Sequence, residues 1–311
     1  MLIVTDSTDY AARLLPAVPG WSPDVCYPSG ALAAFAEQVF GERPAFRSEQ
    51  GGPGPWSYLF VSETARGSHF DLLVELGRQG TALPDGTLCV AGSGSGLHGM
   101  RGRHWTALPG NIHLSVRLRA PPGLTWSAAP FVALAAVSVV ETIDRIPGLA
   151  GRAGIRWVND VFIDGAKVSG ILAHVDADES SIASAVIGIG LNVETRPSVE
   201  PSMFVPRTDS LVHAGGEPAA CHLGAVFAIL LEALAVNWRR LSTGGVTGIV
   251  EAYRRRSLVL GRHVTVFTEE EEGRPVERAS GRVVRLGDDL ELYLDGRARP
   301  LTTGRVVLGE P

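Results

Sequence analysis

Hydrophobic and polar residues alternate most clearly in one stretch near the middle of the chain. Between residues 111 and 119, Ile, Leu and Val occupy every second position, and His113, Ser115 and two arginines stand between them. A period of two is typical of a strand with one buried face and one face that reaches polar groups. We therefore expect a sheet strand here, with His113 and Ser115 on its polar side.

The same kind of pattern predicts alternating strands and helices on both sides of this strand. A run of Ala, Val and Leu at 127–146 is long enough for a buried helix packed on the sheet. The other predicted strands are at 58–64, 87–92, 155–160, 167–175 and 184–193, and the other predicted helices are at 70–79, 223–241 and 247–256. We expect an α+β domain over 58–257, with helices on a mixed sheet.

The two ends of the chain have a different pattern. Residues 1–57 begin with a strand at 2–5 and a helix at 31–39, then pass into a loop rich in Gly and Pro at 47–56, which predicts a boundary. We assign no role to this segment. Residues 258–311 hold short strands separated by Gly and Asp turns, which predicts a small SH3-like β-barrel.

The composition is that of a globular protein. The 311 residues are 45% apolar and 20% charged, which excludes a disordered chain. The longest apolar run has 13 residues, at 128–140, whereas a membrane span needs about 20. Three cysteines without a CxxC pair predict neither a disulfide framework nor a zinc site, so we expect a reducing, cytoplasmic location.

The net charge of −5 argues against a surface built to bind nucleic acid. Residues 1–60 hold three arginines, no lysine and six acidic residues, so no basic recognition helix is visible and we expect no DNA partner. The charge is unevenly distributed, however. Between Asp85 and Glu141 there is no acidic residue, and this interval contains His98, His104, His113, Arg101, Arg103, Arg117 and Arg119.

This cationic interval coincides with the glycine-rich loop AGSGSGLHGMRGRHW at 91–105. Glycines let backbone N–H groups converge, and guanidinium groups offer paired donors, so the loop is typical of a phosphate-binding segment. The alternative is a surface loop with solvated arginines. Its literal GxGxxG, at Gly94, Gly96 and Gly99, is not a dinucleotide fingerprint, because no helix follows it and no acid arrives before Glu141.

A second group of polar residues lies in RWVNDVFIDGAKVSGIL at 156–172. We expect Asn159 and Asp160 to end a strand and Lys167 to open the next one, with a hairpin turn at Asp164 and Gly165. Gly170 would let a ligand or another backbone approach this strand closely. A lysine ammonium near a carboxylate and a phosphate can neutralise the charge that develops in acyl-phosphate chemistry. The alternative for Lys167 is a solvated hairpin lysine.

Several motifs, in order, resemble the biotin protein ligases of the biotin and lipoate ligase superfamily. They are MRGRHW at 100–105, LPGNIHLSV at 108–116, RWVND at 156–160, DGAKVSGIL at 164–172 and IGIGLNV at 187–193. The resemblance covers about residues 58–311. It implies a class II synthetase-like ligase domain and a reaction in which biotin and Mg-ATP form biotinyl-AMP. A lysine of a biotin carboxyl carrier domain then takes the biotin.

The resemblance also implies the residues of the site. Lys167 and Arg103 would be catalytic, with Lys167 between carboxylate and α-phosphate and Arg103 on the phosphates with Arg101. Asp160 would be the candidate Mg²⁺ ligand, and the Trp105 ring would lie against one side of the adenine. The residues expected to bind substrate or nucleotide are Ser68, His69, Gly94, His98, Gly99, Met100, Arg101, Gly102, Trp105, Asn111, Asn159, Asp160, Gly170, Ile171 and Asn192.

The ligand loop departs from the family pattern. Where the family has a glutamine, a Gly-Arg pair and a further arginine, this chain has Gly94, Leu97-His98 and Met100, and Gly67-Ser68-His69 replaces Ser-Thr-Asn. These changes keep two other hypotheses open: a ligase of the same fold for another carboxylic acid, fatty, lipoyl-like or specialised, and a non-catalytic sensor of biotin or an adenylate. The sequence also leaves a homodimer open.

Overall fold

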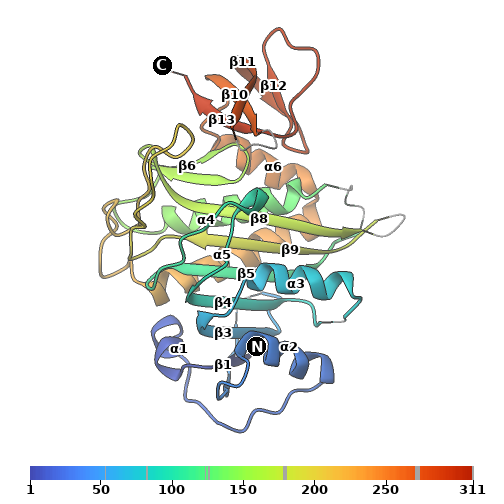
Figure 1. The fold of residues 1–311 in the computed structure, drawn as a ribbon, viewed down its shortest axis with the longest axis vertical. Helices are drawn as coiled ribbons and strands as arrows, with labels where there is room; N and C mark the ends of the chain where they lie inside the picture. Colours follow the sequence, from blue (N-terminus) through green and yellow to red (C-terminus); the bar gives the residue numbers. More distant parts are fainter. Residues whose placement is uncertain are drawn as a thin grey trace.

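The computed structural model describes residues 1–52, 54–81, 83–122, 124, 127–177, 181–269 and 274–309. Within these ranges, nine strands form one mixed sheet in the order β2-β1-β3-β4-β5-β9-β8-β7-β6 (Figure 1). β3 pairs in parallel with β1 and β4, and the other neighbours are antiparallel. The strands are β1 (Leu2–Thr5), β2 (Phe46–Glu49), β3 (Tyr58–Ala65), β4 (Thr87–Gly94), β5 (Ile112–Arg119), β6 (Ala153–Arg156), β7 (Asp160–Ile163), β8 (Ala166–Ala177) and β9 (Ile182–Leu191). The predicted α+β class with a mixed sheet is confirmed.

Helices cover both faces of this sheet (Figure 1). One face packs against α4 (Ala129–Asp144), α5 (Leu223–Gly244) and α6 (Val246–Arg255), and Leu59 and Leu88 point into this larger core. The next residues along the strands, Phe60 and Cys89, join a second core with α2 (Gly30–Phe40) and α3 (His69–Arg78). The alternation of the strands therefore separates the two cores, as a period of two requires.

Residues 1–57 add two strands to the edge of the same sheet. β1 lies between β2 and β3, and the short helix α1 (Thr8–Leu14), capped by Ser7, contacts α5. The predicted loop at 47–56 was wrong at its start, because residues 47–49 belong to β2. Arg47 and Glu49 have no strong preference for strands, so the sequence did not predict β2. These residues are in a strand because they pair with β1.

The predicted strand at 155–160 was also wrong, because it is two strands joined by a tight turn. β6 ends at Arg156, β7 begins at Asp160, and these two residues are direct partners across the hairpin. Asp160 therefore opens a strand instead of ending one. The Asn159 side-chain amide ties this turn to β8 by donating to the Ile171 carbonyl over 2.6 Å. The predicted turn at Asp164 and Gly165 is confirmed, with positive φ at both residues.

The C-terminal residues form a small antiparallel sheet with the order β12-β11-β10-β13 among the described residues. Its strands are β10 (His263–Glu269), β11 (Pro275–Leu286), β12 (Leu292–Leu294) and β13 (Arg305–Leu308). The indole N–H of Trp157 donates to the Leu290 carbonyl over 2.7 Å and joins this sheet to the β6–β7 turn. Among the described helices, none has the length and apolar character that crossing a membrane requires.

Candidate active site

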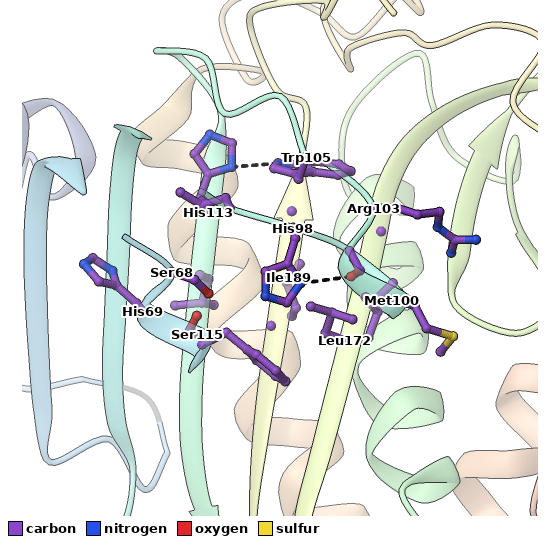
Figure 2. Close-up of a pocket in the computed structure, with 18 of the residues that line it drawn as sticks. Ser68, His69, His98, Met100, Arg103, Trp105, His113, Ser115, Leu172 and Ile189 are labelled. Atoms are coloured by element: carbon purple, nitrogen blue, oxygen red, sulfur yellow. Dashed lines mark hydrogen bonds between the residues drawn. The ribbon is translucent and has the colours of Figure 1, made fainter. Parts of the chain in front are cut away.

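A cavity lies on the α3 side of the sheet, where the loop at 97–105 passes over β5, β9 and β8 (Figure 2). The start of α3 and the β6–β7 turn complete its walls. The residues that line it are Ala65, Gly67, Ser68, His69, Phe70, Ala91, Leu97, His98, Gly99, Met100, Arg103, His104, Trp105, His113, Leu114, Ser115, Asn159, Asp160, Lys167, Gly170, Ile171, Leu172, Gly188, Ile189 and Gly190.

Two rows of residues across the strands form the floor of this cavity. The first, which we call the glycine row, runs from His113 on β5 through Gly190 and Gly170 to Asp160 on β7, each paired with the next. The second, which we call the serine row, runs from Ser115 through Gly188 to Leu172. Because the rows are two residues apart on the strands, both face the cavity.

Trp105 lies on the bare backbone of the glycine row. A Cβ at Gly190 would overlap the Trp105 ring, and a Cβ at Gly170 would lie 3.3 Å from it. The indole N–H of Trp105 donates to Nδ1 of His113 over 3.1 Å (Figure 2). The two glycines thus make room for the ring, and His113 fixes its polar edge.

His113 accepts this bond because it is neutral. Its side chain is buried, and burial lowers the pKa of His113 to about 4. With Nδ1 accepting from Trp105, Nε2 carries the hydrogen and faces the Leu108 carbonyl at 3.4 Å. The tautomer of His113 therefore follows from its two neighbours.

Lys167 and Asp160 form an ion pair at the other end of the glycine row. Lys167 Nζ lies 2.6 Å from Asp160 Oδ1, and their side chains are 17% and 16% exposed. Nζ also lies 5.8 Å from the centroid of the Trp105 ring. A lysine held in this way presents a fixed, partly desolvated cation to the cavity, where its charge interacts more strongly than in bulk water.

The loop over the cavity is closed by its own backbone. The Trp105 N–H donates to the Leu97 carbonyl over 3.0 Å, and the Gly99 N–H donates to the Arg103 carbonyl over 2.6 Å. Arg101 and Gly102 have positive φ at the tip. These bonds make the loop a tight hairpin.

Side chains from α3 cover the serine row. The Phe70 ring lies 3.0 Å from the place of a Cβ on Gly188. Ser68 caps α3 by accepting the Asp71 N–H over 3.1 Å, and its hydroxyl hydrogen stays available to the cavity. This end of the cavity therefore combines two hydroxyls, from Ser68 and Ser115, with apolar walls.

A second cavity continues from the first toward the C-terminal sheet. The side chains of Arg101, Arg103, Arg156 and Arg305 line it, together with Asp160. Burial lowers the pKa of Arg156 to about 10, with Asp160 opposing and Arg305 adding to the effect. Four guanidinium groups beside one carboxylate make this extension cationic, as the acid-free interval of the sequence predicts in part.

The structure brings most of the predicted site residues together. Ser68, His69, His98, Gly99, Met100, Arg103, Trp105, Asn159, Asp160, Lys167, Gly170 and Ile171 line the first cavity, and Arg101 lines its extension. Gly94, Gly102, Asn111 and Asn192 are not among the lining residues of either cavity.

The two asparagines support the site from behind. The Asn111 side chain accepts the N–H groups of Val193 and Thr195 and donates to the Thr195 carbonyl. Asn192 donates to the Asp209 carbonyl over 2.9 Å, next to the backbone that pairs with Lys167. Their positions hold the segment after β9 against the strands of the floor.

The site prediction did not include His113, Ser115, Phe70 and the glycines of β9. The alternating pattern at 111–119 placed His113 and Ser115 on a polar face, which is the signal that could have identified them. Gly188 and Gly190 lie in the IGIG run, where glycine in a strand marks a close approach.

Comparison with known proteins gives a consistent result. The model of the biotin/lipoate A/B protein ligase family matches residues 60–192. The biotin--[acetyl-CoA-carboxylase] ligase of Mycobacterium tuberculosis is 30% identical over 221 residues, 70% of this chain and 77% of that protein. The bifunctional ligase/repressor BirA of Bacillus subtilis is 33% identical over 187 residues, 60% of this chain and 56% of that protein. The chain thus spans little more than half the length of this last relative.

A solved structure has the same fold. The biotin protein ligase from Aquifex aeolicus in complex with biotin and ATP aligns with a TM-score of 0.61 at 20% identity, covering 81% of this chain and 99% of that one. At this identity the likeness concerns the fold.

Proposed function

Because the chain belongs to the biotin/lipoate A/B protein ligase family, we propose that it is a biotin protein ligase. It would join biotin to AMP at the expense of ATP and pass the biotin to a lysine of a carrier domain. The observation that carries the proposal is the Lys167–Asp160 pair beside Trp105, in a cavity that continues into an extension lined by four arginines.

In the first step, a carboxylate oxygen of biotin attacks the α-phosphorus of ATP and pyrophosphate leaves. Negative charge gathers where the carboxylate and the phosphate meet, and the Lys167 ammonium is placed to neutralise it. Trp105 offers its ring to the adenine over the glycine row. Arg101 and Arg103, with Arg156 and Arg305 behind them, suit the leaving pyrophosphate.

Mg²⁺ accompanies ATP in such a reaction, and the residues present fit it. No group of three or more His, Cys, Asp or Glu side chains lies together in the described ranges. Mg²⁺ is commonly held by one or two carboxylates with phosphate oxygens and waters, so Asp160 alone is a sufficient protein ligand. When bound, the ion would offset phosphate charge.

In the second step, the amine of a carrier lysine attacks the acyl carbon of biotinyl-AMP. The new amide forms as AMP leaves, and the amine loses its proton. We propose a biotin carboxyl carrier domain as the acceptor because the relative from M. tuberculosis is named as a biotin--[acetyl-CoA-carboxylase] ligase.

The test is exchange of labelled pyrophosphate into ATP, measured with and without biotin, and then with a carrier domain. We expect biotin-dependent exchange and a labelled carrier. Lys167→Met should lower the rate about 100- to 1,000-fold, the usual loss when one charge-stabilising donor is removed, while the melting temperature stays close to that of the wild type. Binding of biotin without exchange would instead support the sensor hypothesis.

A second candidate function is adenylation of another carboxylic acid, and one feature favours it. The serine-row end of the cavity has apolar walls from Leu97, Met100 and Leu172, and its polar side chains are two hydroxyls and His98. Buried polar groups of a substrate that find no partner cost about 1–3 kcal/mol each. The same exchange assay with octanoate and lipoate in place of biotin decides between the acids.

Four further statements stay predictions from the sequence. They are an SH3-like barrel for residues 258–311, a cytoplasmic location, the absence of a DNA partner and the possible formation of a homodimer. The small antiparallel sheet β10–β13 supports the first of them.

A further inference from the structure

His98 makes two hydrogen bonds that define its charge. Its Nδ1 lies 3.0 Å from the Gly99 carbonyl oxygen, and its Nε2 lies 2.7 Å from Oδ2 of Asp71 on α3. A carbonyl oxygen and a carboxylate oxygen only accept, so both ring nitrogens must carry hydrogen. The geometry thus favours the imidazolium form.

The groups around this ring come from four elements. α3 contributes the Asp71 carboxylate, and the loop contributes Arg103 and the backbone of His104, which bridges to His98. The strands of the floor contribute uncharged side chains, Ser115 and Leu172. The Lys167–Asp160 pair belongs to the glycine row. Asp71 is therefore the carboxylate in contact with His98.

The backbone of Asp71 is held in place independently of the loop. It lies in the first turn of α3, where a carboxylate is favoured by the helix dipole, and its N–H donates to the Ser68 hydroxyl. The His98 side chain is 28% exposed and that of Asp71 is 54% exposed. The pair thus joins a fixed helix terminus to the loop at the edge of the cavity.

We propose that His98 is a positioning residue that, through Asp71, fastens the loop at 97–105 over the serine row before any substrate binds. Both N–H groups of His98 are used within the protein, so none is left to donate to a ligand. The far end of the substrate then meets the face of the imidazolium and the hydroxyls of Ser68 and Ser115. This second consequence rests on the proposed function, whereas the fastening of the loop does not.

Limited trypsin digestion of the free protein tests the fastening, with mass spectrometry of the cleavage after Arg101 and Arg103. We expect Asp71→Asn and His98→Gln to be cut there about three- to tenfold faster than the wild type, the range for a charged hydrogen bond that is partly exposed. His98→Arg restores a cation and should stay within about twofold of the wild type. Glu75→Gln, on the same helix and bonded to Gln79, is the matched control and should not change the rate.

Dependence on pH separates this pair from a merely structural side chain. The bond to the Gly99 carbonyl, and then Asp71, raise the pKa of His98 against the effect of burial. The pair therefore contributes fully below the usual histidine pKa of about 6.5 and is lost as pH rises through the raised value. The cleavage-rate ratio of Asp71→Asn to wild type should fall toward one between about pH 6 and about pH 9.

Equal cleavage of wild type, Asp71→Asn and His98→Gln at about pH 6 would overturn the proposal, as would a ratio that does not change with pH. The kinetics of pyrophosphate exchange test the second consequence, the contact of His98 with the substrate. His98→Gln should raise KM for biotin about threefold or more, as expected when a contact at one end of the cavity is lost. If no exchange occurs with any acid, the proposed function fails, and the digestion result still decides the fastening.

Discussion

Three of the four histidines that line the cavity differ in their preferred charge because their surroundings differ. His98 faces two acceptors and is charged, whereas His113 and His69 are buried and neutral. Burial, and to a lesser degree Arg43, lower the pKa of His69 to about 4. The same side chain thus serves as a cation at the loop and as a hydrogen-bond acceptor under Trp105.

Replacing His113 should disturb Trp105 before it disturbs the fold. In His113→Phe the indole N–H loses its acceptor, which costs about 1–3 kcal/mol for a buried donor. We expect KM for ATP to rise about tenfold, while KM for biotin stays within about twofold. His113→Gln offers an oxygen and should recover most of the loss. Equal effects of both variants on ATP and biotin would refute the assignment.

The buried histidines also predict a loss of stability in acid. Their pKa values are lower in the folded protein than the usual value of about 6.5, so the unfolded chain binds protons first as pH falls. The free energy of unfolding should decrease between about pH 6.5 and about pH 4, by about 1.4 kcal/mol per unit for each residue.

Urea titrations across this range measure the slope. His69→Gln and His113→Gln should each flatten it, and an unchanged slope in both variants would contradict the prediction. His98 has the opposite sign, because its raised pKa contributes stability that is lost as pH rises through that raised value.

The sequence identified the charged groups of the site more completely than the residues that position them. Lys167, Arg103 and Asp160 are recognisable because their chemistry suits the reaction. The role of His113 depends on its hydrogen bond with Trp105, eight residues away, and no local pattern in the sequence predicts that bond. The side chains of Asn111 and Asn192 form hydrogen bonds, but with the backbone behind the cavity and not with groups inside it.

Among the elements, β9 connects the two ends of the cavity through two glycines. Gly190 lies under Trp105 and Gly188 lies under Phe70. Gly190→Ala should push Trp105 away and raise KM for ATP about tenfold, because the added Cβ meets a ring held by a hydrogen bond. Gly188→Ala should instead raise KM for the acid.

Each of these variants is the control for the other, because both add one methyl group to the same strand. Initial-rate measurements with biotin and ATP varied in turn give the two KM values. If both variants change both constants equally, the division of the cavity into a glycine row and a serine row is wrong.

Element prediction failed where tertiary partners decide the local structure. The stretch 155–160 has the composition of one strand, yet it turns after Arg156, so that two short strands pair with each other. β2 likewise exists because β1 offers it a partner. By contrast, the long strands and helices with a clear period were predicted within a few residues of their observed ends.

On the scale of the molecule, residues 1–57 share the sheet with the candidate active site. Ile3 on β1 is fully buried in the larger core, and Trp56 donates to the Leu231 carbonyl on α5 over 3.4 Å. Ile3→Ala should therefore lower the free energy of unfolding by about 2–5 kcal/mol, as for other buried aliphatic residues.

Chemical denaturation followed by circular dichroism and by tryptophan fluorescence measures this effect. Both signals should shift together, because one core connects the segment to the rest. Asp24→Asn, on the exposed surface of the same segment, should leave the midpoint unchanged. A loss of structure confined to residues 1–57 in Ile3→Ala would show that the segment unfolds independently.

The backbone floor under Trp105 limits how the specificity of this protein can be altered by selection or design. Gly170 and Gly190 contribute peptide groups, which no codon change removes. A Cβ at Gly190 would overlap the Trp105 ring, and a Cβ at Gly170 would lie 3.3 Å from it. Substitutions that allow other carboxylic acids to bind should therefore accumulate around Phe70, His98 and Met100, which lie over the serine row, while the residues at the nucleotide end stay constant. A mutagenesis library restricted to those three positions would be small.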